Sequence, residues 1–400
     1  MSNLESLTSG VVDIKPGGNE ALKKLLEKAK EEGRQLRVKL GIDPTSSDLH
    51  LGHMVCIQKL KQFQDAGHLP VLLIGGYTAQ VGDPSGRNEA RPPLTKEEVQ
   101  MHAQTYLDQV SRVLDLDKAE VVNNADWFEK FTMTDMVKLA GKFTINQMIA
   151  KEAFGKRLDE GNPLYMHEIM YPVLQGYDSY EIKADIELGG TDQTFNLMVG
   201  RDIQRAHEQA AQLCMTMPLL VGLDGSKKMS KSSKNYIALN DSANDMFGKV
   251  MSIPDELIVD YFTLAARATQ EEIADVKSKL ESGENPRNVK VLLGKKIVEI
   301  YYDAAAAEEA EQAFVNQFKK KEIPDDIPEL ALDTEAEISS LVLDAKLCAS
   351  KGEFKRLVAG GGVKLDGEKV ADHTIKISLG DVDSKVLQIG KRKFLKLVKK

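Results

Sequence analysis

Two histidines occur close together at a point where the chain is expected to change from strand to helix. His50 and His53 flank Gly52, after a predicted strand at 37–42 and at the start of a helical pattern. A helix N-terminus carries unpaired N–H groups and partial positive charge, so it binds phosphates, and imidazoles there can donate to phosphate oxygens. Gly52 allows a nucleoside to approach the backbone, and Thr45 adds a hydroxyl donor. Alone, such a pair is at least as often a capping or packing feature.

A second cationic stretch lies far along the chain. Residues 225–234 interleave small residues with lysines, among them Lys228 and Lys231. Ammonium groups on a flexible loop can close over a triphosphate and neutralise a leaving pyrophosphate, which stabilises the transition state by positioned charge. Taken alone, this composition more often indicates a solvated basic loop. Neither of the familiar phosphate loops, G-x-x-x-x-G-K-[ST] and G-x-G-x-x-G, occurs in the chain as a competing explanation.

Three polar side chains recur at helical spacing. Tyr171, Gln175 and Asp178 stand at i, i+4 and i+7, so they share one face of a helix. Polar groups on a face that otherwise looks buried need partners. A satisfied polar network in the core explains them as well as a ligand pocket does.

The elements that would position these residues follow an α/β pattern. The alternation at 37–42, the helix after it and the apolar run at 71–74 make a βαβ unit. Further strands are predicted at 182–188 and 218–222. We therefore expect residues 1–235 to form a doubly wound, parallel-sheet domain of the Rossmann-like α/β class.

The rest of the chain changes character twice. Ala, Glu, Lys and Leu dominate from 242 to 321, which predicts an α-helical domain over 236–322. Two close prolines predict an acidic linker over 323–334, and a short helix with an Asp-Gly hairpin predicts a small α+β module at 335–400. Residues 351–400 hold 13 Lys or Arg against 6 Asp or Glu, which suits a polyanionic partner. A solvated tail or a structural cap would explain the same charge.

Composition limits the class of protein. Four hundred residues with 42% apolar content can bury a substantial core and favour two or three domains. Cys56, Cys214 and Cys348 form no C-x-x-C pair, so neither a disulfide framework nor a zinc ribbon is indicated, and no protein-bound metal is expected. His167-Glu168 lacks the second histidine of the zinc-protease pattern H-E-x-x-H. With no basic-then-apolar N-terminal segment and no 18-residue apolar run, we expect a cytoplasmic protein without a membrane partner.

The two cationic segments occur in one chain, in this order, on either side of a predicted α/β domain. Together they resemble the H-I-G-H and K-M-S-K-S motifs of the class I aminoacyl-tRNA synthetases, and the run Tyr-Pro-x-x-Gln-x-x-Asp closely resembles tyrosyl-tRNA synthetases of the bacterial type. The resemblance implies a homodimeric tyrosine–tRNA ligase. Such an enzyme forms tyrosyl-adenylate and pyrophosphate from tyrosine and ATP, which Mg²⁺ accompanies, and then transfers tyrosine to the 3′ end of tRNA(Tyr).

The resemblance also assigns roles to single residues. Its catalytic and ATP-binding positions are His50, His53, Lys228, Lys231 and Thr45, with Gly52, Gly190, Asp192, Met229, Ser230 and Ser232. Its tyrosine-binding positions are Asp83, Thr78, Tyr171, Gln175, Asp178, Gln193 and Lys39, of which Asp178 accepts from the phenolic hydroxyl. By the same resemblance, 236–322 binds the anticodon and 335–400 is a ribosomal-protein-like RNA-binding module. RNA contacts there fall to Lys351, Lys355, Arg356 and Lys364, while Arg87 and Arg91 match positive positions near the pyrophosphate or the tRNA acceptor end.

Two positions depart from the family pattern. Many bacterial members have a tyrosine at the position of Lys39 that helps to hold the phenol, and a glutamine is often found at that of Glu187. The first departure leaves the second partner of the hydroxyl undefined and indicates a sub-branch of the family. No editing domain is visible, and none is needed, because a buried carboxylate that loses its hydroxyl partner costs far more than a missing methylene; tyrosyl-tRNA synthetase is itself the standard example of this effect.

Three alternatives stay open at this point. Tryptophanyl-tRNA synthetases share the fold and both ATP motifs, although Gln175, Tyr177 and the terminal module favour tyrosine. A metabolic nucleotidyltransferase that uses H-x-G-H would not explain the lysine loop together with a basic RNA module. An RNA-binding paralogue on an inactive catalytic frame is disfavoured by the intact histidines, lysines and carboxylates.

Overall fold

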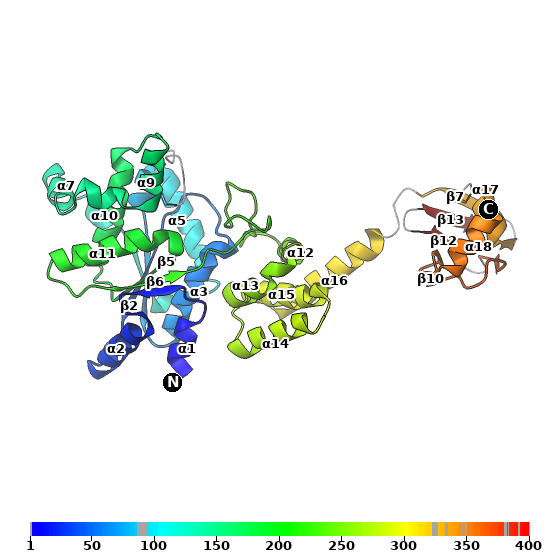
Figure 1. Ribbon diagram of the computed structural model, residues 1–400, viewed down its shortest axis with the longest axis horizontal. Helices are drawn as coiled ribbons and strands as arrows, with labels where there is room; N and C mark the ends of the chain where they lie inside the picture. The colour runs from blue at the N-terminus through cyan, green and yellow to red at the C-terminus, as the bar shows by residue number, and fades with distance from the viewer. Residues whose placement is uncertain are drawn as a thin grey trace. The chain divides into compact units, whose positions relative to one another are not determined.

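The computed structural model describes residues 2–85, 94–321, 327–332, 335–345, 347–348, 350–379, 382, 384–390 and 393–399. The chain forms two compact units, Met1–Glu311 and Gln312–Lys400 (Figure 1). Within the described residues, no helix is both long and apolar enough to span a bilayer.

A six-stranded sheet forms the centre of the first unit. Its order is β1-β6-β5-β2-β3-β4, with β1 antiparallel to β6 and all other neighbours parallel. The chain runs from β2 outward to β3 and β4 and then returns to β5 and β6 on the other side, so the topological switch point lies between β2 and β5. This is the predicted doubly wound α/β class. The strands are β1 (Asp13–Lys15), β2 (Arg37–Ile42), β3 (Leu69–Ile74), β4 (Glu120–Asn123), β5 (Ile186–Gly190) and β6 (Leu213–Met217).

Two of the predicted strands are confirmed, one overlaps a strand but begins too early, and one is wrong. The predictions at 37–42 and 71–74 correspond to β2 and β3. The prediction at 182–188 begins too early, because Ile182 caps the end of a helix. The prediction at 218–222 is wrong: the strand is β6, whose five residues are all buried, and it ends before Pro218, which has no N–H to donate to a ladder.

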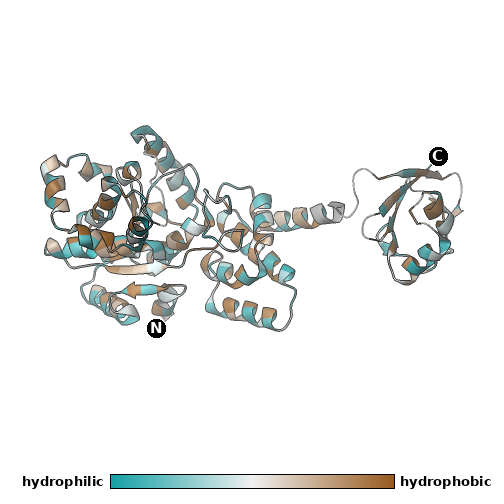
Figure 2. Ribbon diagram, turned by 45° about the horizontal axis from the view of Figure 1, so that its top comes forward, coloured by the Kyte–Doolittle hydropathy of each residue, from teal (hydrophilic) through white to brown (hydrophobic). Residues whose placement is uncertain are grey.

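Helices pack against this sheet and against one another. α3 (Leu51–Asp65) contacts β2, β3 and β5, and α10 (Met166–Glu181) packs along α11 (Thr194–Ala206). A Cβ added at Gly176 would lie 3.0 Å from the backbone nitrogen of Gly200, so the close approach of α10 and α11 requires glycine there. The hydrophobic colour of the sheet strands in Figure 2 marks the core. Other helices of this region are α1 (Ser2–Thr8), α2 (Gly18–Glu31), α4 (Thr78–Val81), α5 (Lys96–Val110), α6 (Ala125–Phe128), α7 (Met133–Ala140), α8 (Ile145–Ile149) and α9 (Glu152–Asp159).

The helical character predicted after residue 242 is confirmed. Pro286 opens α15 at a position where its missing N–H costs nothing, behind an Asn285 cap, and Thr269 with Glu272 forms a capping box on α14. The helices are α12 (Ala243–Met251), α13 (Ile258–Leu264), α14 (Gln270–Glu281), α15 (Pro286–Tyr301) and α16 (Ala304–Lys321).

The second unit contains a five-stranded sheet of order β10-β9-β12-β13-β7 around its own apolar core. The predicted hairpin is confirmed: β9 and β10 pair about Asp366 and Gly367, both at positive φ, as a type I′ turn needs. Part of the predicted linker is corrected, because 329–332 pairs with β13 as a parallel strand; leucines at alternate positions supply the signal that the prolines obscured. The elements are β7 (Glu329–Leu332), β8 (Ala336–Glu337), α17 (Ile338–Asp344), α18 (Lys351–Ala359), β9 (Val363–Leu365), β10 (Glu368–Lys369), β11 (Lys376–Ile377), β12 (Ser384–Ile389) and β13 (Lys393–Lys399).

Candidate active site

A cavity of about 840 Å³ opens beside the carboxyl ends of β2 and β5, at the topological switch point where open α/β sheets bind ligands. It brings together all of the residues that the sequence placed in the catalytic, ATP-binding and tyrosine-binding sets. These lining residues are Lys39, Thr45, His50, Gly52, His53, Thr78, Asp83, Tyr171, Gln175, Asp178, Gly190, Asp192, Gln193, Lys228, Met229, Ser230, Lys231 and Ser232. Their individual roles remain predictions.

The histidine segment begins helix α3, as predicted. His50 is the N-cap residue in extended conformation, and its backbone N–H donates to Nδ1 of His53 at 3.2 Å. The two rings stack with centroids 3.7 Å apart. A Cβ at Gly52 would lie 3.0 Å from the His50 ring, so glycine there keeps the ring in place. Both imidazoles are therefore held at the helix N-terminus, beside its unpaired N–H groups.

His50 is a neutral, buried imidazole. Burial, with a further contribution from Lys231, lowers the pKa of His50 to about 4. The ring is 7% exposed, and its Nδ1 has no hydrogen-bond partner among the described residues. This nitrogen lies against the first turn of α3, where a Cβ at Gly52 would come within 3.0 Å of it.

The lysine loop lies beside this helix start because the backbone fixes it there. Leu51 N–H donates to Ile237 O at 3.1 Å, and Leu239 N–H donates to Leu49 O at 3.0 Å, so the segment after the loop pairs with the histidine segment. Within the loop, Ser230 N–H donates to the buried side chain of Asn235 at 2.8 Å. Two regions far apart in sequence thereby reach one cavity.

The side chains of Lys228 and Lys231 each bond one polar group from another part of the chain. Lys228 Nζ lies 2.8 Å from Asp192, and Lys231 Nζ donates to the Ser46 hydroxyl at 2.6 Å. Burial lowers the pKa of Lys231. Of the other loop residues predicted to bind ATP, Met229 is buried, while the hydroxyls of Ser230 and Ser232 lie 3.3 Å apart. We define the cationic group as Lys228 and Lys231 together with the adjoining imidazoles of His50 and His53, and name it for its two lysines.

Gly190 ends β5 where side chains crowd the backbone. A Cβ there would meet an Asp192 oxygen and a Leu219 methyl, each at 2.8 Å. Asp192 follows in a short 3₁₀ turn, half-exposed to the cavity. A carboxylate after a Gly-Gly turn at the carboxyl end of a parallel strand can accept from the hydroxyls of a ribose.

Hydrogen bonds join the polar residues deeper in the cavity. Tyr171 OH donates to Asp43 Oδ2 at 2.8 Å, and Thr78 Oγ1 donates to Asp43 Oδ1 at 2.7 Å. Asp83 accepts from Gln193 Nε2 at 2.8 Å. The carboxylates of Asp43 and Asp83 can form ion pairs with an ammonium group.

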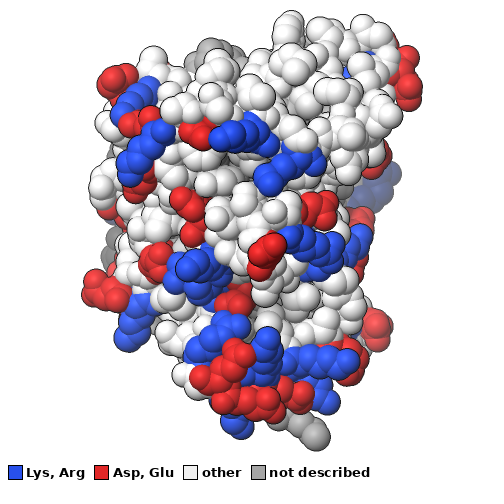
Figure 3. Space-filling view, turned by 90° about the vertical axis from the view of Figure 1, so that its left-hand side faces the viewer, with Lys and Arg blue, Asp and Glu red and all other residues white. Residues whose placement is uncertain are grey.

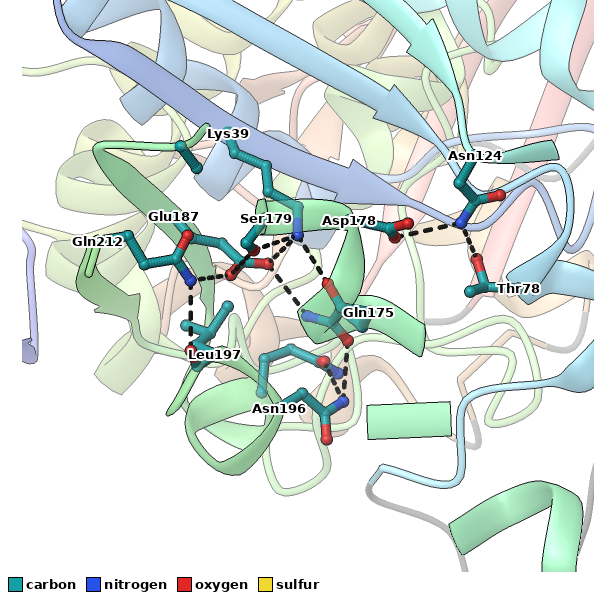
Figure 4. A network of polar contacts seen from close by, with 12 residues as sticks. Lys39, Thr78, Asn124, Gln175, Asp178, Ser179, Glu187, Asn196, Leu197 and Gln212 are labelled. Carbon is teal, nitrogen blue, oxygen red and sulfur yellow. Dashed lines mark hydrogen bonds and ion pairs between the residues drawn. The ribbon is translucent and has the colours of Figure 1, made fainter. Parts of the chain in front are cut away.

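Asp178 is 1% exposed, and its Oδ2 accepts from Asn124 Nδ2 at 3.2 Å (Figure 4). Its other oxygen, Oδ1, accepts from Trp127 Nε1 at 3.1 Å. Burial raises the pKa of Asp178 to about 7, against the opposing charge of Lys39 and the two N–H donors. A carboxylate placed in this way can accept a further hydrogen bond, most strongly when it is ionised. We define the buried group as Tyr171, Gln175 and Asp178 on α10 with Thr78.

Sequence reasoning missed three residues of the cavity network. Asp43 follows β2, Asn124 follows β4, and Trp127 lies on α6. Asp43 also lines the cavity, although the sequence had indicated no role for it. Their available signal was position: polar residues at the carboxyl ends of neighbouring parallel strands meet at one edge of a sheet.

The predicted RNA contacts belong to the second unit and not to this cavity. Lys351, Lys355 and Arg356 are exposed on α18, and Lys364 is half-buried on β9. Arg87 and Arg91 lie outside the described residues.

Comparisons with known proteins agree with one another. The family model described as tRNA synthetases class I (W and Y) matches residues 30–319. A curated relative named tyrosine–tRNA ligase, from Mannheimia succiniciproducens, is 47% identical over 97% of this chain and 98% of its own length. Another of the same name, from Shewanella oneidensis, is 48% identical over 98% of this chain and 99% of its own length. A solved tyrosyl-tRNA synthetase of Archaeoglobus fulgidus, complexed with L-tyrosine, matches with a TM-score of 0.63 and 22% identity over 78% of this chain and 99% of that one, which establishes likeness of fold.

Proposed function

Because the chain belongs to the class I tRNA synthetases of the tryptophan and tyrosine type, we propose that it is an ATP-dependent tyrosine–tRNA ligase. In the first step the tyrosine carboxylate attacks the α-phosphorus of ATP and pyrophosphate leaves. In the second step a hydroxyl at the 3′ end of tRNA attacks the carbonyl of tyrosyl-adenylate and AMP leaves. No protein nucleophile takes part, so the residues act by positioning and charge.

The single observation that carries this proposal is the shared cavity. The cationic group and the buried group line one space, although they come from four separate stretches of the chain. A phosphate chain fits beside imidazoles, ammonium groups and a helix N-terminus, and an aromatic amino acid fits beside Asp178 and the carboxylates. Both substrates of the first step therefore have a place within reach of each other.

The cationic group would act while bonds change. In the structure, Lys228 and Lys231 are held by a half-exposed carboxylate and a hydroxyl, partners that phosphate oxygens can replace. Neutral His50 can donate one hydrogen bond to an oxygen that gains charge as pyrophosphate departs. Mg²⁺ would enter with ATP as its counter-ion, since this part of the cavity offers imidazoles and ammonium groups and no acidic cluster is found among the described residues.

The buried group would choose the amino acid. Asp178 would accept from the phenolic hydroxyl, with Tyr171, Gln175 and Asp83 around the ammonium group. Phenylalanine would leave the Asp178 carboxylate without that partner, which a site of this kind discriminates against by about 10⁴–10⁵. The indole of tryptophan has a different shape and places its N–H donor elsewhere, so the same pocket favours tyrosine.

The second unit would hold tRNA. Exposed Lys351, Lys355 and Arg356 on α18, with Lys364 nearby in sequence, suit sequence-independent contact with phosphates. The helical region at 236–322 would contact the anticodon, and 335–400 would serve as the RNA-binding module. Both assignments, and a location in the cytoplasm, follow from the family and not from the geometry.

We also propose that the enzyme is a homodimer. Large apolar side chains are exposed on α7 to α10, and the face drawn in Figure 3 carries fewer charges in its upper part than at its lower end, where α2 lies. Such a surface is typical of an interface between subunits. The exposed apolar residues are Met133, Val137, Ile145, Leu158, Tyr165 and Met166.

The decisive assay is exchange of labelled pyrophosphate into ATP, run with each of the twenty amino acids. We expect exchange with tyrosine, and a discrimination of about 10⁴ or more against phenylalanine. Exchange with tryptophan alone, or with no amino acid, would reject the proposed function.

A further inference from the structure

A fully buried ion pair adjoins the tyrosine pocket, and the proposed reaction does not use it. Lys39 on β2 and Glu187 on β5 are 0% and 1% exposed, and Lys39 Nζ lies 2.8 Å from Glu187 Oε1 (Figure 4). Burying two charges is costly unless each is paired and hydrogen-bonded. Well-packed apolar residues would stabilise this position as well or better, so the pair calls for a functional explanation.

Lys39 has no hydrogen left for a substrate. Its ammonium group has three N–H donors and three acceptors: Glu187 at 2.8 Å, the Ser179 hydroxyl at 2.7 Å and the main-chain carbonyl oxygen of Gln175 at 3.0 Å. It therefore cannot donate to a phenolic hydroxyl while this arrangement holds. Any effect on tyrosine passes through the groups that Lys39 touches and through its charge.

Glu187 fixes the side chain of Gln175. Gln175 Nε2 donates to Glu187 Oε1 at 3.3 Å, and the side-chain oxygen Oε1 of Gln175 accepts from Asn196 Nδ2 at 3.0 Å. Turning the Gln175 amide over would place its oxygen against the Glu187 carboxylate and lose both bonds. The second oxygen of Glu187 accepts from Ser179 at 2.9 Å and from the Gln212 amide. The network thus holds the Gln175 carbonyl as an acceptor beside the cavity.

The pair also lies close to Asp178, because Lys39 binds Ser179, the next residue along α10, and both members act on the charge of that carboxyl. The direct partners of Asp178 are the neutral N–H groups of Asn124 and Trp127, so its carboxylate depends on charges at longer range. Those are Lys39 on β2, which lowers the pKa of Asp178, and Glu187 on β5, which raises it. Hydrogen bonds connect Tyr171 and Asp43 to Asp178 through the Thr78 and Asn124 side chains. Burial raises the pKa of Cys214 on β6, beside the pair, to about 12, so this thiol is neutral.

We propose that the Lys39–Glu187 pair is a positioning element for tyrosine recognition: it holds the Gln175 amide in its acceptor orientation, and its ammonium group favours the charged form of Asp178 that accepts a phenolic hydroxyl. Lys39 thus does not bind the phenolic hydroxyl of tyrosine directly, and its charge acts on the hydroxyl through Asp178. This inference rests on the proposed function; it gives Lys39 an indirect role in place of the predicted contact with tyrosine and adds Glu187 as a second residue that sets specificity without touching the substrate.

The test measures tyrosine binding without ATP, by equilibrium dialysis of the full chain across neutral pH. Because the pKa of Asp178 is raised to about 7, affinity in the unmodified protein falls as the pH drops below about 7. We call this fall of affinity at low pH the acid limb. Lys39→Met should move the acid limb to higher pH, which raises the Kd about tenfold at a fixed pH on the limb, and Glu187→Gln should move it to lower pH, which lowers the Kd about tenfold there. The neutral double variant Lys39→Met/Glu187→Gln should return the limb toward its original place.

A second buried ion pair supplies the matched control. Arg157 and Glu168 are both 2% exposed and 2.7 Å apart, and neither lines the cavity. Arg157→Met/Glu168→Gln should lower the melting temperature and leave the acid limb where it is.

Several results would overturn the proposal: an unmoved limb in both single variants, shifts of the same sign, or an equal shift in the control. If Lys39→Met does not fold, Glu187→Gln decides alone, because an unmoved limb in that variant is sufficient to reject it. Failure of the unmodified protein to bind tyrosine would instead reject the proposed function, and it would be seen before any variant is made.

Discussion

The cationic group and the buried group share one cavity but are built in opposite ways. His50, His53, Lys228 and Lys231 come from a helix start and a loop, and the two lysines bond a half-exposed carboxylate and a hydroxyl. The residues around Asp178 stand on α10 and at strand ends, and a continuous hydrogen-bond network occupies them. Groups that stabilise charge during bond breaking can be held loosely until the substrate arrives, whereas groups that select a substrate must be ordered beforehand.

The largest effect is expected from breaking the cationic group. Lys231→Met should lower kcat for tyrosine-dependent pyrophosphate exchange by about 10²–10³, because one positioned charge at the leaving group is lost. Tyrosine affinity without ATP should not change. Lys234→Met, on the same loop and outside the cavity lining, is the control and should retain full exchange. A loss confined to tyrosine affinity would show that the two groups are not separate in function.

The converse change alters the buried group. Asp178→Asn should reduce discrimination between tyrosine and phenylalanine, measured as the ratio of kcat/KM, by about 10²–10³, because the amide no longer offers a charged acceptor to the phenol. The KM for ATP should stay within about twofold. His53→Gln is its counterpart: it should lower kcat and leave discrimination intact. Equal losses in both quantities for either variant would contradict the division of labour.

A smaller effect tests whether charge outside the cavity serves only the RNA step. Lys355→Glu/Arg356→Glu should raise the KM for tRNA about tenfold and leave pyrophosphate exchange unchanged, since the loss of phosphate contacts weakens association with RNA. The exposed pair Lys23→Glu/Lys24→Glu on α2 is a charge-matched control and should change neither quantity. If the first variant charges tRNA normally, the second unit is structural.

The smallest effect concerns the stability cost of a buried imidazole. The pKa of His50 is lowered from 6.5 to about 4, so the unfolded chain binds more protons than the folded one between these values. The stability that neutral His50 contributes is therefore present above about pH 6.5 and is lost as the pH falls toward 4. His50→Gln should reduce the drop in melting temperature between neutral and mildly acidic pH by about 2–4 °C. An unchanged drop would show that His50 is not buried as a neutral ring.

Much of this site could be predicted from sequence because its residues follow local patterns. Each of these patterns can be recognised in a short stretch of sequence: the alternation in β2, the two cationic motifs, and the helical spacing of Tyr171, Gln175 and Asp178. Their meeting in one cavity followed from the family resemblance and the rule for open α/β sheets.

What escaped prediction depends on distant partners. Asp43 and Asn124 are single polar residues at strand ends, and their importance appears only when Thr78 and Asp178 come to lie beside them. β6 contains Cys214 and Thr216 in place of a run of branched apolar residues, so a buried strand went unrecognised while the apolar run after Pro218 was taken for one. Lys39 could be noticed as unusual, yet its three partners all come from other elements.

The most direct test is a crystal structure of the full chain with a non-hydrolysable analogue of tyrosyl-adenylate. We expect its phosphate-like group beside the helix start at His50, with Lys228 and Lys231 close by, and its phenolic oxygen within hydrogen-bond distance of Asp178. A nucleotide that lies away from either cationic segment, or a phenol that points to a different side chain, would contradict the account.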